Sequence, residues 1–203
     1  SFPTRRSSDL SGVGGRTRNP YALDRNPCGS SSGSGAATAA SLAAAALGTE
    51  TDGSVVCPSS ANGVVGIKPT VGLVSRTRIV PISATQDTAG PMARSVSDAA
   101  ALLTVMAGSD AEDSATRAAD AKRVDYTAAL DPNALAGKRI GVARFLAGYH
   151  AGTDALFDEA IAALRAGGAE IVELKDGPPR SEIGPAEFTV LLTELKVGLN
   201  AYL

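Results

Sequence analysis

The stretch Gly29-Ser30-Ser31-Ser32-Gly33-Ser34-Gly35 and the stretch Gly48-Thr49-Glu50-Thr51-Asp52-Gly53-Ser54 enclose an alanine-rich segment, residues 36–47. Glycine reaches backbone conformations that are closed to other residues, so both stretches predict tight turns whose N–H groups can approach a ligand. The segment between them predicts one buried helix. Two candidate reactive hydroxyls, those of Ser30 and Ser54, therefore stand 24 positions apart (54 − 30) on two glycine turns.

The composition is that of a globular protein with a core of useful size. The chain has 203 residues, of which 44% are hydrophobic, and a formal net charge of −2. That balance gives no basic surface for nucleic acid. No apolar run approaches the length of roughly 18 residues that a membrane span needs. We therefore expect neither nucleic acid nor a membrane as a partner.

Two cysteines, Cys28 and Cys57, lie close in sequence to the two serine turns. They are too few for a disulfide framework or a metal site. Small buried thiols are the favoured interpretation, and a disulfide between the two is the less favoured one. The cysteines say little about the compartment, and no cofactor or metal is expected.

The rest of the chain predicts short strands and three further helices. Residues 64–67 predict a buried strand, and 73–75 and 79–82 predict short extended pieces. Gly90-Pro91 predicts a break before a helix whose apolar positions run from Val96 to Met106, capped by Ser95 and ended by Gly108. Another helix is expected to begin at Glu187 and continue to Leu203.

A strand, a helix and a second strand are predicted in succession at 139–144, 154–166 and 171–174. This order implies parallel strands and an α/β architecture.

The first ten residues resemble the translation of a common sequencing adapter, so they are treated as an artefact and left out of the fold. Residues 11–203 are then expected to be a partial domain, cut inside a helical pattern at its end.

A serine hydroxyl is a poor nucleophile until a base takes its proton. A triad with histidine would have to use His150, the only histidine, which we interpret as an exposed loop residue. A phosphate-binding loop is the alternative role for residues 29–35, but no Gly-Lys-Ser/Thr follows. Neither of these two roles explains both serine turns.

Four ordered blocks of the chain together resemble the amidase signature family of serine hydrolases. They span roughly residues 27 to 107, and their most specific parts are residues 27–34, 47–54, 63–72 and 86–98. The resemblance implies a fold of the α/β class, a mixed β-sheet sandwiched between helix layers, which would be incomplete in these residues. It also implies a Ser-cisSer-Lys mechanism for hydrolysis of a carboxamide C–N bond.

Carried over position by position, the resemblance makes Ser54 the acylated nucleophile and Ser30 the relay serine, preceded by a cis peptide bond. The backbone N–H groups of four consecutive residues would form the oxyanion hole, and a fifth residue would support the network. The hole would be formed by Thr51, Asp52, Gly53 and Ser54, and the support by Ser31.

One residue of the family pattern is missing. The family's catalytic lysine lies well upstream of the relay serine, whereas the first lysine here is Lys68, after both serines. Arginines before Ser30 are too basic to take its place. The resemblance thus implies an amidase, and the chain as given is expected to be an inactive piece of one.

Substrate and partners follow from the resemblance as well. Many members carry an arginine two or three residues after the nucleophile, where this chain has Val56 and Cys57, which favours neutral amides. Residues 19–24 and 49–58 resemble the peptide-amidase-like branch, so a small-molecule or peptide amide is the expected substrate. The alternatives are a glutamine-hydrolysing subunit of a tRNA-dependent amidotransferase and a non-catalytic relative. A homodimer is left open.

Overall fold

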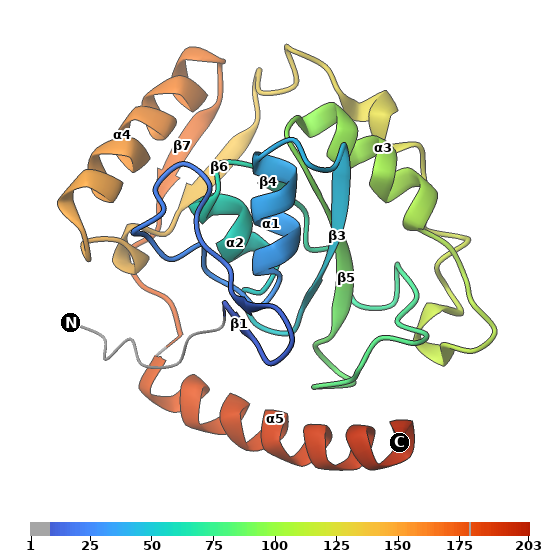
Figure 1. Ribbon diagram of the computed structural model, residues 1–203. Coiled ribbons are helices and arrows are strands. Elements are labelled where there is room, and N and C mark those ends of the chain that lie inside the picture. The colour runs from blue at the N-terminus through green and yellow to red at the C-terminus, as the bar shows by residue number, and fades with distance from the viewer. Residues whose placement is uncertain (1–8, 179) are drawn as a thin grey trace. The chain divides into compact units, whose positions relative to one another are not determined.

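A computed structural model describes residues 9–178 and 180–203 (Figure 1). Most of the segment interpreted as an adapter, residues 1–8, lies outside the described residues. The chain divides into two compact units. The first unit runs to Thr127 and includes Val190–Leu203, and the second comprises Ala128–Thr189. The mixture of helices and short sheets is the α/β class predicted from the sequence.

An antiparallel sheet of three strands organises the first unit. Its order is β3 (Ala45–Glu50), β5 (Thr88–Ala93) and β4 (Val65–Gly66), with β5 in the centre and buried throughout. Helix α1 (Ser32–Ala39) packs on β3 and β5, and the short helix α2 (Val56–Ala61) packs on β4 and α1 (Figure 1). The two serine turns therefore precede α1 and connect β3 to α2.

The alanine-rich segment is not one helix, so that prediction was wrong. Helix α1 begins at Ser32 and ends at Ala39, and residues from Ala45 onward form β3. The chain reverses at Ser41, which has a φ of 58°. Arg94 fixes the reversal, because its Nη1 donates to the carbonyls of Thr38 and Ala43, each at 3.0 Å. Alanine is compatible with helix and strand, and tertiary hydrogen bonds decide between them here.

Gly90 and Pro91 were predicted to break the chain, but both lie inside the central strand β5. A Cβ at position 90 would collide with the Ile67 carbonyl oxygen, so only glycine lets the strands approach this closely. Pro91 serves the sheet as an acceptor, with its carbonyl bound by the Ile67 N–H at 3.1 Å. Gly90 and Pro91, although typical of turns, therefore lie in a strand where two backbones approach closely.

Helix α3 (Val96–Met106) begins where the sequence predicted it, because the Ser95 hydroxyl accepts the Asp98 N–H at 3.1 Å. Its Leu103 packs with Val74 and Ala89 in the buried core of this unit. Residues 73–75 and 79–82 contribute only a single bridge, between Val74 and Ala107, and no strand. Four small elements complete the unit and its border: β1 (Leu10–Ser11), β2 (Gly15–Arg16), η1 (Ser114–Thr116) and η2 (Tyr126–Ala129).

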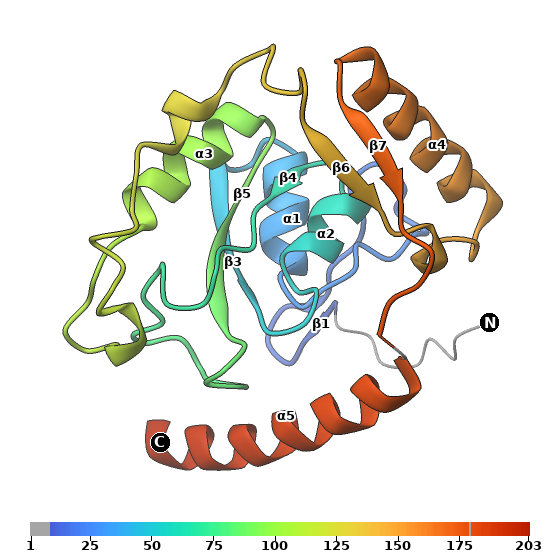
Figure 2. The same cartoon turned by 180° about the vertical axis from the view of Figure 1, so that it is seen from behind.

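The second unit contains the predicted strand–helix–strand succession. Strands β6 (Arg139–Val142) and β7 (Glu170–Glu173) pair in parallel, and α4 (Ala151–Ala166) connects them (Figure 2). The short helix η3 (Arg144–Leu146) follows β6. Helix α4 begins three residues earlier than predicted because the His150 ring accepts the Thr153 N–H at 3.2 Å.

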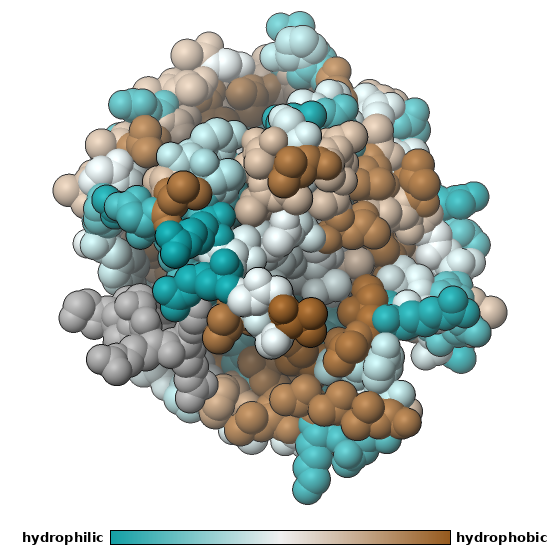
Figure 3. Space-filling model, viewed as in Figure 1, coloured by the Kyte–Doolittle hydropathy of each residue, from teal (hydrophilic) through white to brown (hydrophobic). Residues whose placement is uncertain are grey.

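The last helix, α5 (Arg180–Tyr202), begins before the predicted Glu187. Figure 3 shows apolar side chains gathered along this helix, and Phe188, Leu192 and Val197 are each more than half exposed. Among the described residues, none of the helices is both long and apolar enough to cross a membrane.

Candidate active site

The two serine turns lie against each other. The Ser31 N–H donates to the Ser54 carbonyl at 3.2 Å. The Ser31 hydroxyl donates to the Thr49 carbonyl at 3.2 Å and accepts the Thr49 N–H at 3.1 Å. Ser31 thus binds the end of β3 through both backbone groups of one residue. Two serines that are 23 positions apart in sequence, Ser31 and Ser54, are thereby in direct contact near the end of the sheet.

Ser30 and Ser54 have different surroundings within this cluster. The peptide bond between Gly29 and Ser30 is cis, as the resemblance implied. The Ser30 side chain is exposed, whereas Ser54 is half-buried just before α2.

Glu50 holds the turn from Thr51 to Ser54 at its far end. Its buried carboxylate accepts the backbone N–H groups of Val55 at 2.7 Å and Val56 at 2.9 Å. Gly53 has a φ of 80°, a conformation that side chains rarely adopt. Sequence reasoning did not single out Glu50. Its signal would have been a carboxylate in an otherwise apolar strand just before a turn.

Asp87 holds the same turn at its near end. The Thr51 hydroxyl donates to Asp87 Oδ1 at 2.5 Å, and Oδ2 accepts the N–H groups of Ile82 and Ser83, each at 2.8 Å. Asp87 is buried. In the sequence, Asp87 belongs to one of the blocks that resemble the amidase signature family, but no role was predicted for it. Its partner Thr51 is 36 residues away, and neighbouring residues do not indicate that pairing.

Cys28 and Cys57 form a disulfide, so the prediction of two small buried thiols was wrong. The Cys57 side chain is exposed and that of Cys28 only partly covered. The bond closes because the two serine turns are adjacent, which places the two Cα atoms 5.8 Å apart. Cys28 lies two residues before Ser30, and Cys57 lies three residues after Ser54.

The remaining candidates lie elsewhere. His150 is exposed and caps α4 in the second unit. Lys68 is exposed in the loop after β4. In the part of the chain that the structure describes, no cluster of three histidine, cysteine or acidic side chains could hold a metal ion.

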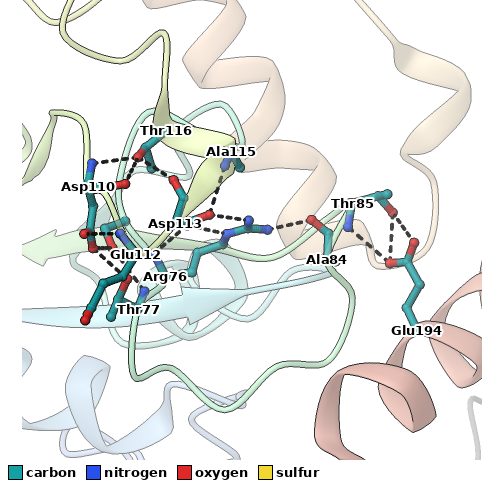
Figure 4. Close-up of polar contacts among 11 residues, drawn as sticks. Arg76, Thr77, Ala84, Thr85, Asp110, Glu112, Asp113, Ala115, Thr116 and Glu194 are labelled. Carbon is teal, nitrogen blue, oxygen red and sulfur yellow. Dashed lines mark hydrogen bonds and ion pairs between the residues drawn. The ribbon is translucent and has the colours of Figure 1, made fainter. Parts of the chain in front are cut away.

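A second polar cluster is formed by residues 75–77, 84 and 110–116 of the first unit (Figure 4). Arg76 donates to both carboxylate oxygens of Asp113, at 2.8 and 2.9 Å, and to the Ala84 carbonyl. This guanidinium lowers the pKa of Asp113 to about 2. Hydrogen bonds from the Ser75 and Thr77 hydroxyls lower the pKa of Asp110. Its donors and acceptors satisfy one another, which indicates a structural role for the cluster.

Comparison with known proteins identifies the family of this chain. The family model for amidases matches residues 6–197, so the chain belongs to the amidase family. A putative amidase of Arthroderma benhamiae is 49% identical over 198 residues, which are 95% of this chain and 33% of that protein.

Two further relatives differ in kind. The solved peptide amidase of Stenotrophomonas maltophilia is 53% identical, with a TM-score of 0.89, over 98% of this chain and 41% of that one. A subunit of the glutamyl-tRNA(Gln) amidotransferase of Acinetobacter baylyi is 42% identical over 97% of this chain and 40% of its own length. The chain thus spans between a third and about two fifths of the length of these relatives.

Proposed function

We propose that this chain is part of an amidase in which Ser54 attacks a carboxamide carbonyl. The contact between the serine turns supports the proposal, since Ser31, the neighbour of Ser30, donates its N–H to the Ser54 carbonyl. The Ser54 oxygen forms an ester with the acyl carbon, and its proton passes through Ser30 to a base. The base gives this proton to the nitrogen as the C–N bond breaks and the amine leaves, and water then hydrolyses the ester and restores Ser54.

The oxyanion of the tetrahedral intermediate is assigned to backbone N–H groups of the turn Thr51–Ser54. Glycine at position 53 lets consecutive N–H groups face one side. Fixed donors of this kind typically contribute about 10²–10³ in rate each. Ser31 supports the arrangement by binding the backbone of Thr49, which lies two residues before the turn.

The base is assigned to a lysine outside these 203 residues. None precedes Ser30, and Lys68 follows both serines with an exposed side chain. Arginine does not accept a proton near neutral pH. The 203-residue chain by itself is therefore expected to hydrolyse no simple amide.

The substrate is proposed to be a neutral amide, such as a peptide with a C-terminal carboxamide. Val56 and Cys57 place no cation beside Ser54 to attract an acidic acyl group. The 53% identity to a peptide amidase supports this choice. A carboxamide-capped peptide should give a higher kcat/KM than malonamate, and the reverse ranking contradicts it.

A second candidate is the glutamine-hydrolysing subunit of a tRNA-dependent amidotransferase. It is favoured by the 42% identity to the amidotransferase subunit of Acinetobacter baylyi. Glutaminase activity together with copurification of a partner protein would favour it over the free-standing amidase.

The test begins at the source locus, which is resequenced on the 5′ side of the Ser11 codon. The reading frame that contains the chain is expressed and assayed on a carboxamide-capped peptide. Ser54→Ala is expected to lower kcat by about 10⁴-fold or more. Ser60→Ala, an exposed serine on α2, is the matched control and should leave kcat unchanged. Turnover that survives Ser54→Ala would overturn the assignment of the nucleophile.

A further inference from the structure

Thr51 and Asp87 stand opposite each other where the central sheet ends. The last pair of the β3–β5 ladder joins Glu50 to Thr88. The next residues outward in this antiparallel register are Thr51 and Asp87. A hydrogen bond between their side chains, at 2.5 Å, follows directly after the ladder. This hydrogen bond attaches Thr51 to the sheet, and Thr51 is the first residue of the turn 51–54, called here the nucleophile turn.

The Asp87 carboxylate is itself held from its other side. Its second oxygen accepts two backbone N–H groups, those of Ile82 and Ser83. The loop 82–85 that supplies them is attached to α5, because Glu194 accepts the hydroxyl of Ser83. Glu194 also accepts the N–H of Thr85, at 3.1 Å (Figure 4). A buried carboxylate with three donors has little freedom to turn.

The nucleophile turn is thus fixed at both ends by carboxylates. Glu50 binds the N–H groups of Val55 and Val56 after the turn, and Asp87 binds Thr51, its first residue. Residues 52–54, between these attachments, carry three of the four N–H groups assigned to the oxyanion. At the near end the attachment to Asp87 runs through one hydroxyl, that of Thr51, so a single substitution can remove it.

We propose that Asp87 is a positioning residue that acts through Thr51 to aim the N–H groups of Asp52, Gly53 and Ser54 at the developing oxyanion. The inference rests on the proposed function. An oxyanion hole stabilises charge only when its donors are already in place. Freedom of the turn therefore lowers kcat while substrate binding, which precedes the charge, changes little.

Thr51→Val tests the proposal, since it removes the hydroxyl and keeps the branched shape. In the expressed reading frame, kcat should fall by about 10- to 100-fold with KM unchanged within about threefold. Thr51→Ser restores the hydroxyl and should restore kcat.

The matched control is Thr77→Val. Thr77 makes the same kind of bond, from its hydroxyl to Asp110 at 2.6 Å, in the polar cluster of residues 75–77, 84 and 110–116. It should leave kcat unchanged. Equal losses in the two valine variants, or failure of serine to rescue position 51, would overturn the positioning role.

Hydrogen exchange of the 203-residue chain provides a measurement that needs no turnover. Thr51→Val should accelerate exchange of amides 52–54 by about tenfold, and Thr77→Val should leave them unchanged. If the protein expressed from the wild-type reading frame hydrolyses no amide, the proposed function fails. Hydrogen exchange of amides 52–54 then tests by itself whether the Thr51–Asp87 bond fixes the turn. Unchanged exchange at 52–54 in Thr51→Val overturns it.

Discussion

The serine-turn region, residues 27–93, and the second unit, Ala128–Thr189, are stabilised in different ways. In the first, buried or half-buried side chains bind backbone groups directly, as Glu50 and Ser31 do. In the second, several charged side chains pair on the surface: Arg139 and Glu170 lie 3.5 Å apart with side chains 72% and 64% exposed. Exposed pairs of this kind contribute little to stability.

The two regions differ in whether side chains fix the position of the backbone. A carboxylate that receives two backbone N–H groups fixes the path of the chain, which the proposed oxyanion site requires. A surface ion pair leaves the backbone where helix and strand geometry put it. Single substitutions should therefore lower the stability of the serine-turn region markedly, whereas the second unit should tolerate them.

The largest effect is expected from Gly90→Ala. The new Cβ would collide with the Ile67 carbonyl oxygen, and a backbone atom in a central sheet cannot move aside cheaply. The free energy of unfolding should fall by about 3 kcal/mol or more, measured by urea denaturation. Gly184→Ala in the second unit is the matched control. It meets nothing within 4 Å inside α5 and should gain about 0.5–1 kcal/mol. Two losses of equal size would remove the contrast between the regions.

The disulfide gives the next largest effect. It closes a loop with a sequence separation of 29 between Cys28 and Cys57. The double variant Cys28→Ser, Cys57→Ser should lose about 3–4 kcal/mol of unfolding free energy, because the unfolded chain regains the freedom of that loop. Reduced wild-type protein should match the variant. Reaction of both thiols with an alkylating reagent in the absence of reductant would show that the bond is not formed.

Sequence patterns predicted those parts of the fold that depend on neighbouring residues. The Ser95 cap, the helix after it and the parallel pair β6–β7 follow from local periodicity and capping. The alanine-rich segment was misassigned because Arg94, more than fifty residues away, ends α1. Gly90 was interpreted as a breaker because its reason, the Ile67 carbonyl, lies in a distant part of the sequence.

The candidate site divides in the same way. The serines and the turn 51–54 could be proposed from the sequence, since a family pattern contains them. The disulfide and the attachments through Glu50 and Asp87 could not, because burial and distance decide them. Residue type alone does not show whether a carboxylate is a surface charge or a fixed acceptor.

The smallest effect is expected from acid, and it sharpens the comparison between buried and exposed ion pairs. Asp113 is buried against Arg76, and its pKa is about 2 in the folded protein, below the ordinary value of 3.8. The unfolded chain therefore binds the proton more readily. The stabilisation is fully present above about pH 4, decreases as the pH falls toward 2, and amounts to about 2 kcal/mol.

Urea denaturation between pH 2 and pH 6 measures this dependence directly. Asp113→Asn should lower stability at neutral pH and flatten the decline between pH 4 and pH 2, because the titrating group is gone. Glu170→Gln removes the exposed partner of Arg139 and should follow the wild-type curve throughout. If Asp113→Asn keeps the acid dependence, other carboxylates cause it, and burial of the Arg76–Asp113 pair does not distinguish it from the surface pairs of the second unit.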